Sequence, residues 1–354
     1  MTKKLILLVI SISFALLSSE LGIRYLRLAW PFEDDLYNPP YLTTRDAPLL
    51  WRFPPSGKRN SLGLRNREVE QKKSGSYRIL FLGDSLVWSG ETSSGKLYTE
   101  VLEQRLNARS PKGTPSFEVI NAGIPGYTTY QELEFLKIYG LDMEPDLVIL
   151  GFVFNDLYYK YLHKPTKRGL LSGEPTIHLY RFNPNAFPGN LVARSHLAHT
   201  LAFEIELLWK KVRHQPIFPF EVRLDFYLAW KEYAWDRTQE LIGEMKTVLA
   251  KRGIPLLIVS FPVTTQVDDR YRRLDQTYVL LPQRKLREIC NAYAIPMLDL
   301  TDTLYKNGGP ALFRDFLHLD PKGNDQITDE IMEFLAAEFG GLAAGARGGM
   351  AFKP

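Results

Sequence analysis

The chain has 354 residues, of which 45% are hydrophobic and 24% are charged, as in an ordinary globular protein. It is long enough for one large domain with insertions or for two unequal units. The net charge is +4, and the densest basic clusters, at 210–213 and 270–273, are each short enough to be a solvated helix face. The composition therefore argues against nucleic-acid binding.

The N-terminus has the pattern of an export segment. Lys3 and Lys4 precede a mostly apolar run at 5–17, and two basic residues before an apolar stretch are typical of signals and anchors. No convincing small-x-small cleavage site follows the run. We therefore favour an uncleaved membrane anchor over a cleaved signal within residues 1–28, and the flanks argue against a buried cytosolic helix.

The orientation of this segment follows from its charges. A membrane span needs about 20 residues, so the helix would extend to about Ile23 and carry Glu20 near the outer boundary, where a carboxylate can reach the interface. The positive-inside rule leaves Lys3 and Lys4 in the cytoplasm and the chain after Arg24 outside it. We expect a membrane-anchored, extracytoplasmic protein, in the periplasm or on the outer face of an inner membrane.

The next segment, at 29–76, is predicted to be an irregular lead-in because its first half is rich in Pro, Asp, Tyr and Trp. Beyond it lies a domain at 77–339, in which helix-like segments alternate with apolar strands that lack polar alternation. This pattern predicts a three-layer α/β/α sandwich with a central parallel sheet of about five strands. The expected strands are 78–82, 117–120, 147–154, 256–261 and 297–300, and the expected helices are 97–108, 128–138, 238–250, 286–293 and 327–339.

Two of these helices carry further predictions. The helix at 128–138 begins with Thr128-Thr129 as its N-cap, and Glu132 is the expected capping-box partner. The helix at 286–293 carries the single cysteine, Cys290, on its apolar face. That position predicts a small buried side chain and not a catalytic thiol.

The segment at 158–233 breaks the alternation and is predicted to be an insertion over the mouth of the site, helical at 201–212. It carries His196 and His199, whose spacing would suit a metal on a helix. No third ligand is obvious near them, so we favour surface or packing histidines and expect no metal. The Gly- and Ala-rich tail at 340–354 is expected to be disordered.

A serine nucleophile is indicated by residues at both ends of the predicted domain. Ser85 directly follows the strand at 78–82, and Asp315 and His318 lie three apart far downstream. A serine hydroxyl is a poor nucleophile until a base takes its proton, and histidine is the side chain suited to this near neutral pH. A carboxylate fixes the histidine tautomer and supports the imidazolium. Ser85, His318 and Asp315 supply these three groups.

Four blocks in order resemble those of the SGNH hydrolases, also called the GDSL esterase/lipase superfamily, of the membrane-anchored bacterial type. The blocks are Gly83-Asp84-Ser85-Leu86, Asn121-Ala122-Gly123-Ile124-Pro125-Gly126, Phe154-Asn155-Asp156 and Asp315-x-x-His318. Any one of them alone could be an ordinary turn or loop. The resemblance covers about 78–335 without the insertion and implies a flavodoxin-like arrangement of the sheet.

The resemblance implies a role for each residue. Ser85 is the nucleophile, His318 is the general base and then the general acid, and Asp315 orients His318. The backbone N–H groups of Ser85 and Gly126 and the side-chain amide of Asn155 form the oxyanion hole. A glycine at 126 lets the backbone approach the substrate closely. No metal or organic cofactor is needed.

One departure from the family pattern is visible. The third block usually reads Gly-x-Asn-Asp, and here Val153 takes the glycine position, where it narrows the pocket or shifts the strand end next to Asn155. No Gly-x-Ser-x-Gly surrounds Ser85, which argues against the nucleophile elbow of the α/β-hydrolases. Asp84 is expected to hold its turn by hydrogen bonds and not to react.

The sequence thus predicts a serine esterase that hydrolyses carboxylic O-acyl esters of small molecules, lipids or cell-envelope carbohydrates through an acyl-serine intermediate. An O-acyltransferase or deacetylase acting on envelope carbohydrate is an alternative, because the acceptor is decided by water exclusion and pocket shape. A non-catalytic envelope-assembly protein on the same fold is another.

Aromatic and apolar residues beside the catalytic positions either line an acyl or sugar pocket or belong to the core, and the sequence favours neither reading. They are Trp88, Tyr127, Phe152, Phe154 and Leu317.

Overall fold

The computed structural model describes residues 2–26, 47–49, 52–110, 116–157, 164–165, 171–172, 182–183, 186–192 and 195–338. The predicted tail at 340–354, much of the lead-in before residue 52 and most of 158–185 lie outside the described residues.

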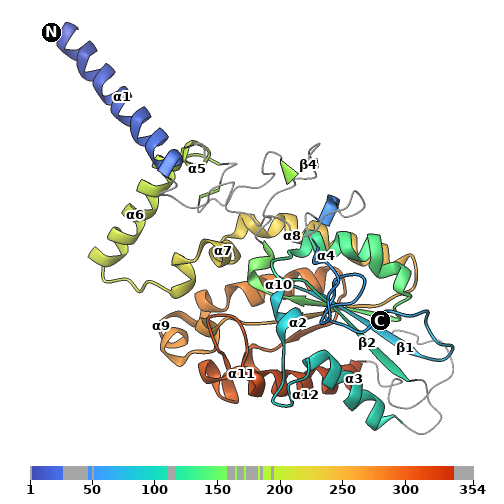
Figure 1. The fold of residues 1–354 in the computed structure, drawn as a ribbon. Helices are drawn as coiled ribbons and strands as arrows, with labels where there is room; N and C mark the ends of the chain where they lie inside the picture. Colours follow the sequence, from blue (N-terminus) through green and yellow to red (C-terminus); the bar gives the residue numbers. More distant parts are fainter. Residues whose placement is uncertain are drawn as a thin grey trace.

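The described chain is built around one five-stranded sheet in the order β2-β1-β3-β6-β7, in which every neighbouring pair is parallel (Figure 1). The predicted three-layer α/β fold with its five-stranded parallel sheet is confirmed. The strands are β1 Tyr77–Gly83, β2 Phe117–Gly123, β3 Leu147–Phe152, β6 Leu256–Ser260 and β7 Met297–Asp299. A two-residue antiparallel pair, β4 Lys164–Pro165 with β5 Leu171–Ser172, lies apart from this sheet.

Helices cover both faces of the sheet, and this is why β1, β2, β3 and β6 are almost wholly buried. On one face α12 packs against α3 and α11, and on the other α4 packs against α8 (Figure 1). The helices are α3 Tyr98–Arg109, α4 Thr129–Phe135, α8 Trp235–Ala250, α9 Asp269–Val279, α10 Leu281–Ala292, α11 Thr301–Lys306 and α12 Pro321–Glu338.

Three glycines lie side by side where the first three strands end. Gly83 pairs with Gly123 on one side and with Gly151 on the other. A Cβ added to Gly123 would lie 2.7 Å from the Cβ of Val87, and one added to Gly151 would lie 2.7 Å from the Cγ2 of Val87. This glycine floor lets the short helix α2, Ser85–Ser89, pack directly on the sheet. Because β1 lies between β2 and β3, the floor also marks the switch point where α/β folds bind ligands.

The capping-box partner of α4 differs from the prediction. Thr128 caps the helix, but its partner is Gln131, whose Oε1 accepts hydrogen bonds from the Thr128 N–H at 3.0 Å and hydroxyl at 2.8 Å. The prediction of Glu132 as the capping-box partner is wrong, because the reciprocal position is three residues after the cap and Glu132 is one residue too far. Glu132 is buried instead, with 1% of its surface exposed.

The lead-in and the later part of the predicted insertion pack onto the domain. In the lead-in, Phe53 stacks on Trp88 with ring centroids 4.9 Å apart. In the insertion, Phe220 stacks on Trp230 at 3.7 Å, and Trp230 packs against Phe154 at 6.1 Å. The stretch that contains η5 Pro219–Val222, α7 Leu224–Tyr227 and η6 Leu228–Trp230 therefore packs into the hydrophobic core. It also contacts the loop that carries His318, because Phe226 lies 5.2 Å from Phe316 between ring centroids.

The N-terminal helix and two helices near it lie away from the sheet. Helix α1, Thr2–Leu26, projects from the domain (Figure 1), and its segment Lys3–Ile23 has a mean hydropathy of 2.1 and is not buried. It is the one helix in the described part of the chain that is long and apolar enough for a membrane anchor or a signal sequence. Next to it lies α6, His196–Val212, preceded by the short α5, Gly189–Val192.

Candidate active site

The structure brings Ser85, His318 and Asp315 together at the carboxyl end of β1. His318 Nε2 lies 2.9 Å from Ser85 Oγ, and His318 Nδ1 lies 2.8 Å from Asp315 Oδ2. In this hydrogen-bonded line the imidazole can take the hydroxyl proton while the carboxylate fixes its tautomer. The arrangement has the geometry that activation of a serine hydroxyl requires.

Asp315 organises the loop that carries His318. Its Oδ1 accepts the backbone N–H groups of Leu317 and His318 at 2.8 and 2.7 Å. Burial acts to raise the pKa of Asp315, but these two N–H groups and the His318 side chain outweigh it and lower the pKa below its usual value. Asp315 is therefore an anion near neutral pH and can hold the Nδ1–H of His318.

Asp84 holds the turn beneath the nucleophile. It is fully buried, and its Oδ1 accepts the N–H of Leu86 at 2.9 Å, which caps α2. Its Oδ2 lies 3.4 Å from Ser85 Oγ and accepts the Nδ2–H of Asn155 at 3.2 Å. One carboxyl group thus fixes the relative positions of Ser85 and Asn155, which is the hydrogen-bonding role expected from the sequence.

Gly126 lies in the loop after β2 and occupies a tight turn. Its φ is +80°, and the N–H of Tyr127 donates to the carbonyl of Ile124 at 3.0 Å. Pro125 and Gly126 are thus the two central residues of a turn that requires a positive φ at the second of them. Within the part of the chain that the structure describes, the N–H of Gly126 makes no hydrogen bond, so this donor is available to a ligand.

Val153 does not turn Asn155 away from the nucleophile. The Val153 side chain is buried in the core, and its backbone closes a turn with Asp156: the Val153 N–H donates to Asp156 Oδ2 at 3.0 Å and the Asp156 N–H donates to the Val153 carbonyl at 2.9 Å. The turn presents the Asn155 amide to Asp84, beside Ser85. Asn155 therefore keeps a second N–H for a ligand at this position.

A protein-family model agrees with this geometry. The model of the GDSL-like lipase/acylhydrolase family matches residues 81–326, more than half of the chain. The chain belongs to this family. As a GDSL-like acylhydrolase it is a carboxylic ester hydrolase, in agreement with the resemblance seen in the sequence.

Solved structures of similar proteins include several ester hydrolases. A lipase/acylhydrolase from Enterococcus faecalis is 16% identical, with 74% of this chain and 96% of that chain covered and a TM-score of 0.41. A catalytic mutant of Axe2, an acetylxylan esterase from Geobacillus stearothermophilus, is 16% identical, with 75% and 96% covered and a TM-score of 0.44. The acetyl xylan esterase AlAXEase is 17% identical, with 72% and 98% covered and a TM-score of 0.42. No curated protein matches this chain.

Of the five aromatic and apolar residues considered as pocket lining, four are buried and one is half-buried. Tyr127 and Phe154 have 1% and 0% of their surface exposed and belong to the core of the acylhydrolase. A ligand cannot reach them in this structure, so these two residues pack in the core and do not line a pocket. Phe152 is fully buried too and Leu317 nearly so, whereas Trp88 is only half-buried beneath Phe53.

Asn121 has a positioning role that the sequence reading did not identify. Its Nδ2–H donates to the carbonyl of Val87 at 2.8 Å, and its Oδ1 accepts the N–H of Gly123 at 3.0 Å. The side chain thus ties α2 to the end of β2. The block that supplies Gly126 also fixes the helix that begins with the nucleophile.

Three buried carboxyl groups, of Asp84, Glu132 and Asp156, lie beneath the acylhydrolase site, and the sequence reading missed them as a group. Burial raises the pKa of each, and the negative charge of a neighbour raises the pKa of Glu132 and Asp156 further. Among the described residues, neither oxygen of Glu132 has a hydrogen-bond partner. Glu132 is therefore the member of the group that is most easily kept protonated.

This cluster predicts a specific dependence of stability on pH. A carboxyl group whose folded pKa is raised stabilises the fold below its unfolded pKa of about 4.3, and this contribution is lost as pH rises through the folded pKa. Above that pH the free energy of unfolding falls as pH rises. We expect Glu132→Gln to make this slope less steep, by up to about 1.4 kcal/mol per pH unit. Denaturant unfolding of the detergent-solubilised chain between pH 5 and pH 9 (roughly the range where proteins are most stable) measures this.

The matched control is Glu333→Gln, on the exposed face of α12. It removes the same charge from solvent and should leave the slope unchanged. Equal slopes in Glu132→Gln and the unmodified protein would show that Glu132 is ionised in the fold.

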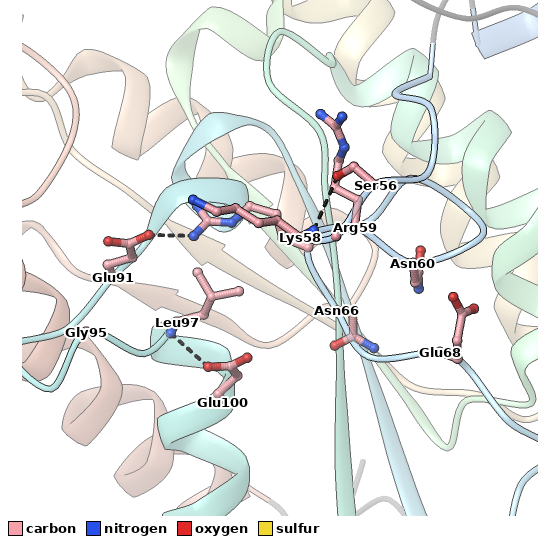
Figure 2. Close-up of a pocket in the computed structure, with 12 residues that line it drawn as sticks. Ser56, Lys58, Arg59, Asn60, Asn66, Glu68, Glu91, Gly95, Leu97 and Glu100 are labelled. Carbon is pink, nitrogen blue, oxygen red and sulfur yellow. Dashed lines mark hydrogen bonds and ion pairs between the residues drawn. The ribbon is translucent and has the colours of Figure 1, made fainter.

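A polar cleft of about 490 Å³ lies between the end of the lead-in and the segment 91–100 (Figure 2). An ion pair between Arg65 and Glu91 lies along its wall. Neither Ser85 nor His318 lines the cleft, so we do not regard it as the binding site of the ester substrate. Its lining is Ser56, Gly57, Lys58, Arg59, Asn60, Arg65, Asn66, Glu68, Glu91, Gly95, Leu97 and Glu100.

Proposed function

We propose that this acylhydrolase is an extracytoplasmic serine esterase that works through an acyl-Ser85 intermediate. The observation that carries the proposal is the line from Ser85 Oγ to His318 Nε2 at 2.9 Å and from His318 Nδ1 to Asp315 at 2.8 Å. This line places His318 where it can act as a base toward Ser85, which supports the catalytic reading over the non-catalytic one.

In the first half of the reaction, Ser85 Oγ attacks the carbonyl carbon of the ester and its proton moves to His318 Nε2. The oxyanion accepts hydrogen bonds from the Gly126 N–H, the free Asn155 amide N–H and the Ser85 N–H. The intermediate collapses with cleavage of the bond to the alcohol oxygen, which takes the proton from His318. The products are the free alcohol and the acyl-Ser85 ester.

In the second half, water attacks the acyl carbon while His318 Nε2 takes a proton from it. The tetrahedral intermediate collapses, and the proton returns to Ser85 Oγ as the carboxylic acid leaves. Asp315 stays ionised and stabilises the imidazolium in both halves. An acyltransferase would differ only in replacing this water with an acceptor hydroxyl.

The location is proposed from α1. Lys3 and Lys4 precede its apolar segment, so the positive-inside rule supports a single N-terminal span with the catalytic domain outside the cytoplasm. This location would present the site to O-acylated envelope carbohydrates or to lipid esters. It would not present the site to cytosolic acyl donors, which favours hydrolysis over transfer.

The proposal is tested by labelling the full chain with a fluorophosphonate probe and mapping the modified residue. Labelling at Ser85, with release of carboxylic acid from a short p-nitrophenyl ester, supports the esterase. A folded protein that neither labels nor turns over ester is the non-catalytic alternative. Acyl groups that appear on an added sugar in preference to water would indicate a transferase.

The proposed oxyanion hole gives a quantitative expectation. Asn155→Ala removes one donor and should lower kcat by about 10²-fold or more, because a single preorganised donor contributes roughly 3–4 kcal/mol. Steady-state kinetics with a p-nitrophenyl ester measure the loss. Asn291→Ala, at an exposed position on α10, is the control. An unchanged kcat in Asn155→Ala would remove this amide from the oxyanion hole.

A further inference from the structure

Helix α6 presents an apolar stripe to solvent. Successive members of the stripe are four, three, one and three residues apart, so they share one face of the helix. Contiguous exposed apolar surface on a folded protein marks an interaction site. The members and their exposed fractions are Leu201 50%, Ile205 63%, Leu208 60%, Trp209 56% and Val212 66%.

The opposite face of α6 is fixed to the rest of the protein. Glu206 accepts a hydrogen bond from the hydroxyl of Tyr227 at 3.2 Å, and Lys210 forms an ion pair with the buried Glu221. These contacts lie on the side away from the stripe. The helix therefore cannot turn its apolar face inward without breaking them.

The first turn of α6 is attached to the outer end of α1. Glu20 of α1 accepts the Ser195 hydroxyl at 2.7 Å and the N–H groups of His196 and Leu197 at 3.1 and 2.8 Å. A carboxylate at a helix N-terminus is stabilised by the free N–H groups and the helix dipole. The contact gives a hydrogen-bond partner to Glu20, the one acidic residue in the apolar segment Lys3–Ile23. It also holds the start of α6 level with Glu20 along the axis of α1.

The directions of the two helices complete the geometry. Figure 1 shows α6 leaving the end of α1 in a different direction, so that the two helices form a corner. If α1 crosses a membrane, a helix that starts at its outer end and turns away from its axis runs along the lipid surface.

We propose that α6 lies in the outer membrane–water interface as an amphipathic helix, with its stripe among the lipid chains. The proposal rests on the membrane anchor of the proposed function. The C-terminal turn of α6 carries Lys211, and Arg213 follows it, with its guanidinium 4.3 Å from the ring centre of Trp209. Basic residues and a tryptophan beside an apolar stripe suit anionic headgroups and the interfacial layer. The stripe therefore contacts the lipids of the same membrane that α1 enters.

The test measures lipid contact residue by residue in the full chain. Ile205→Cys and Leu208→Cys each receive an environment-sensitive fluorophore, since the native Cys290 is buried and burial raises its thiol pKa to about 12. The labelled proteins are reconstituted into phosphatidylcholine–phosphatidylglycerol vesicles, at about 3:1, that contain lipids with a quencher on the acyl chain. Ester turnover confirms that each variant is folded.

Two further labels serve as references. Leu274→Cys, on α9, is 57% exposed and matches the exposure of Leu208, but lies outside α6. Ile10→Cys reports on α1, where Ile10 is 59% exposed. We expect quenching at 205 and 208 to exceed that at 274 by about twofold or more.

The outcomes separate this proposal from the anchor on which it rests. If the label at 10 is quenched while the labels at 205 and 208 are quenched no more than the label at 274, the α6 placement is overturned and the anchor stands. Quenching at 205 and 208 without quenching at 10 supports the α6 placement and overturns the anchor. Quenching at none of the sites overturns both. Labels at 205 and 208 that are shielded from aqueous quencher but untouched by lipid quencher indicate a protein partner, and overturn the lipid surface as occupant.

Discussion

Ester hydrolysis is expected to fall by about 10⁴- to 10⁶-fold in Ser85→Ala. The variant loses the only hydroxyl in contact with His318 among the described residues. The fold should survive, because Asp84 keeps its hydrogen bonds to Leu86 and Asn155 and so continues to hold the turn. Turnover of a p-nitrophenyl ester and fluorophosphonate labelling measure the activity, and thermal unfolding checks the fold.

Ser94→Ala is the control for this experiment, because Ser94 lies in the loop after α2 and its hydroxyl contacts only Thr92 among the described residues. It should keep both turnover and labelling. Undiminished turnover in Ser85→Ala would remove Ser85 from the mechanism, and with it the acyl-serine intermediate. Loss of turnover with labelling retained at another serine would place the nucleophile elsewhere.

The second large effect is expected in the glycine floor. In Gly151→Ala the added Cβ would lie 2.7 Å from Val87 Cγ2 and 3.0 Å from the ring of Phe81, so the Val87 side chain must give way, and we expect this to displace α2. Val87 is two residues after Ser85, and a nucleophile displaced by about 1 Å can cost about 10²-fold in rate. We expect a loss of this size in kcat, measured with a p-nitrophenyl ester, with the protein still folded.

A second substitution tests the cause of that loss. Val87→Ala removes the Cγ2 that the new methyl group meets, so the double variant should recover part of the activity lost by Gly151→Ala. Gly57→Ala is the control, because a Cβ at Gly57 would have no atom within 4 Å. A double variant no more active than Gly151→Ala alone would show that contact with α2 is not what the glycine protects.

The sheet, and the hydrogen-bonded line of Ser85, His318 and Asp315, could be predicted because the sequence patterns that indicate them are local. Apolar runs without polar alternation indicate buried parallel strands wherever they occur. Ser85 directly follows one such run, and Asp315 and His318 are neighbours in sequence, so the geometry needed only that the two loops meet. The parallel order of the strands then placed both loops at the same edge of the sheet.

The predictions that failed or stayed open depend on packing, which local sequence does not encode. Glu132 has the spacing of a residue near a helix N-terminus, and only the tertiary structure turns its side chain into the core. Tyr127 and Phe154 are adjacent to site residues in sequence, yet they face the hydrophobic interior. The stretch 218–230 belongs to the predicted insertion over the site, and local sequence did not show that its aromatic residues stack on each other and on Phe154, or that Phe226 packs on Phe316.

The order of the catalytic groups along the chain has a consequence for biosynthesis. Ser85 and His318 are 233 positions apart. The start of α12, directly after the loop that carries His318, is tied back toward α2 by the hydrogen bond from Asn324 Nδ2 to the carbonyl of Glu91 at 2.9 Å. Contacts this distant in sequence form late in folding. The line from Ser85 to His318 and Asp315 therefore cannot form until nearly the whole chain has been synthesised, and a chain that ends before residue 315 lacks both the imidazole and the carboxylate.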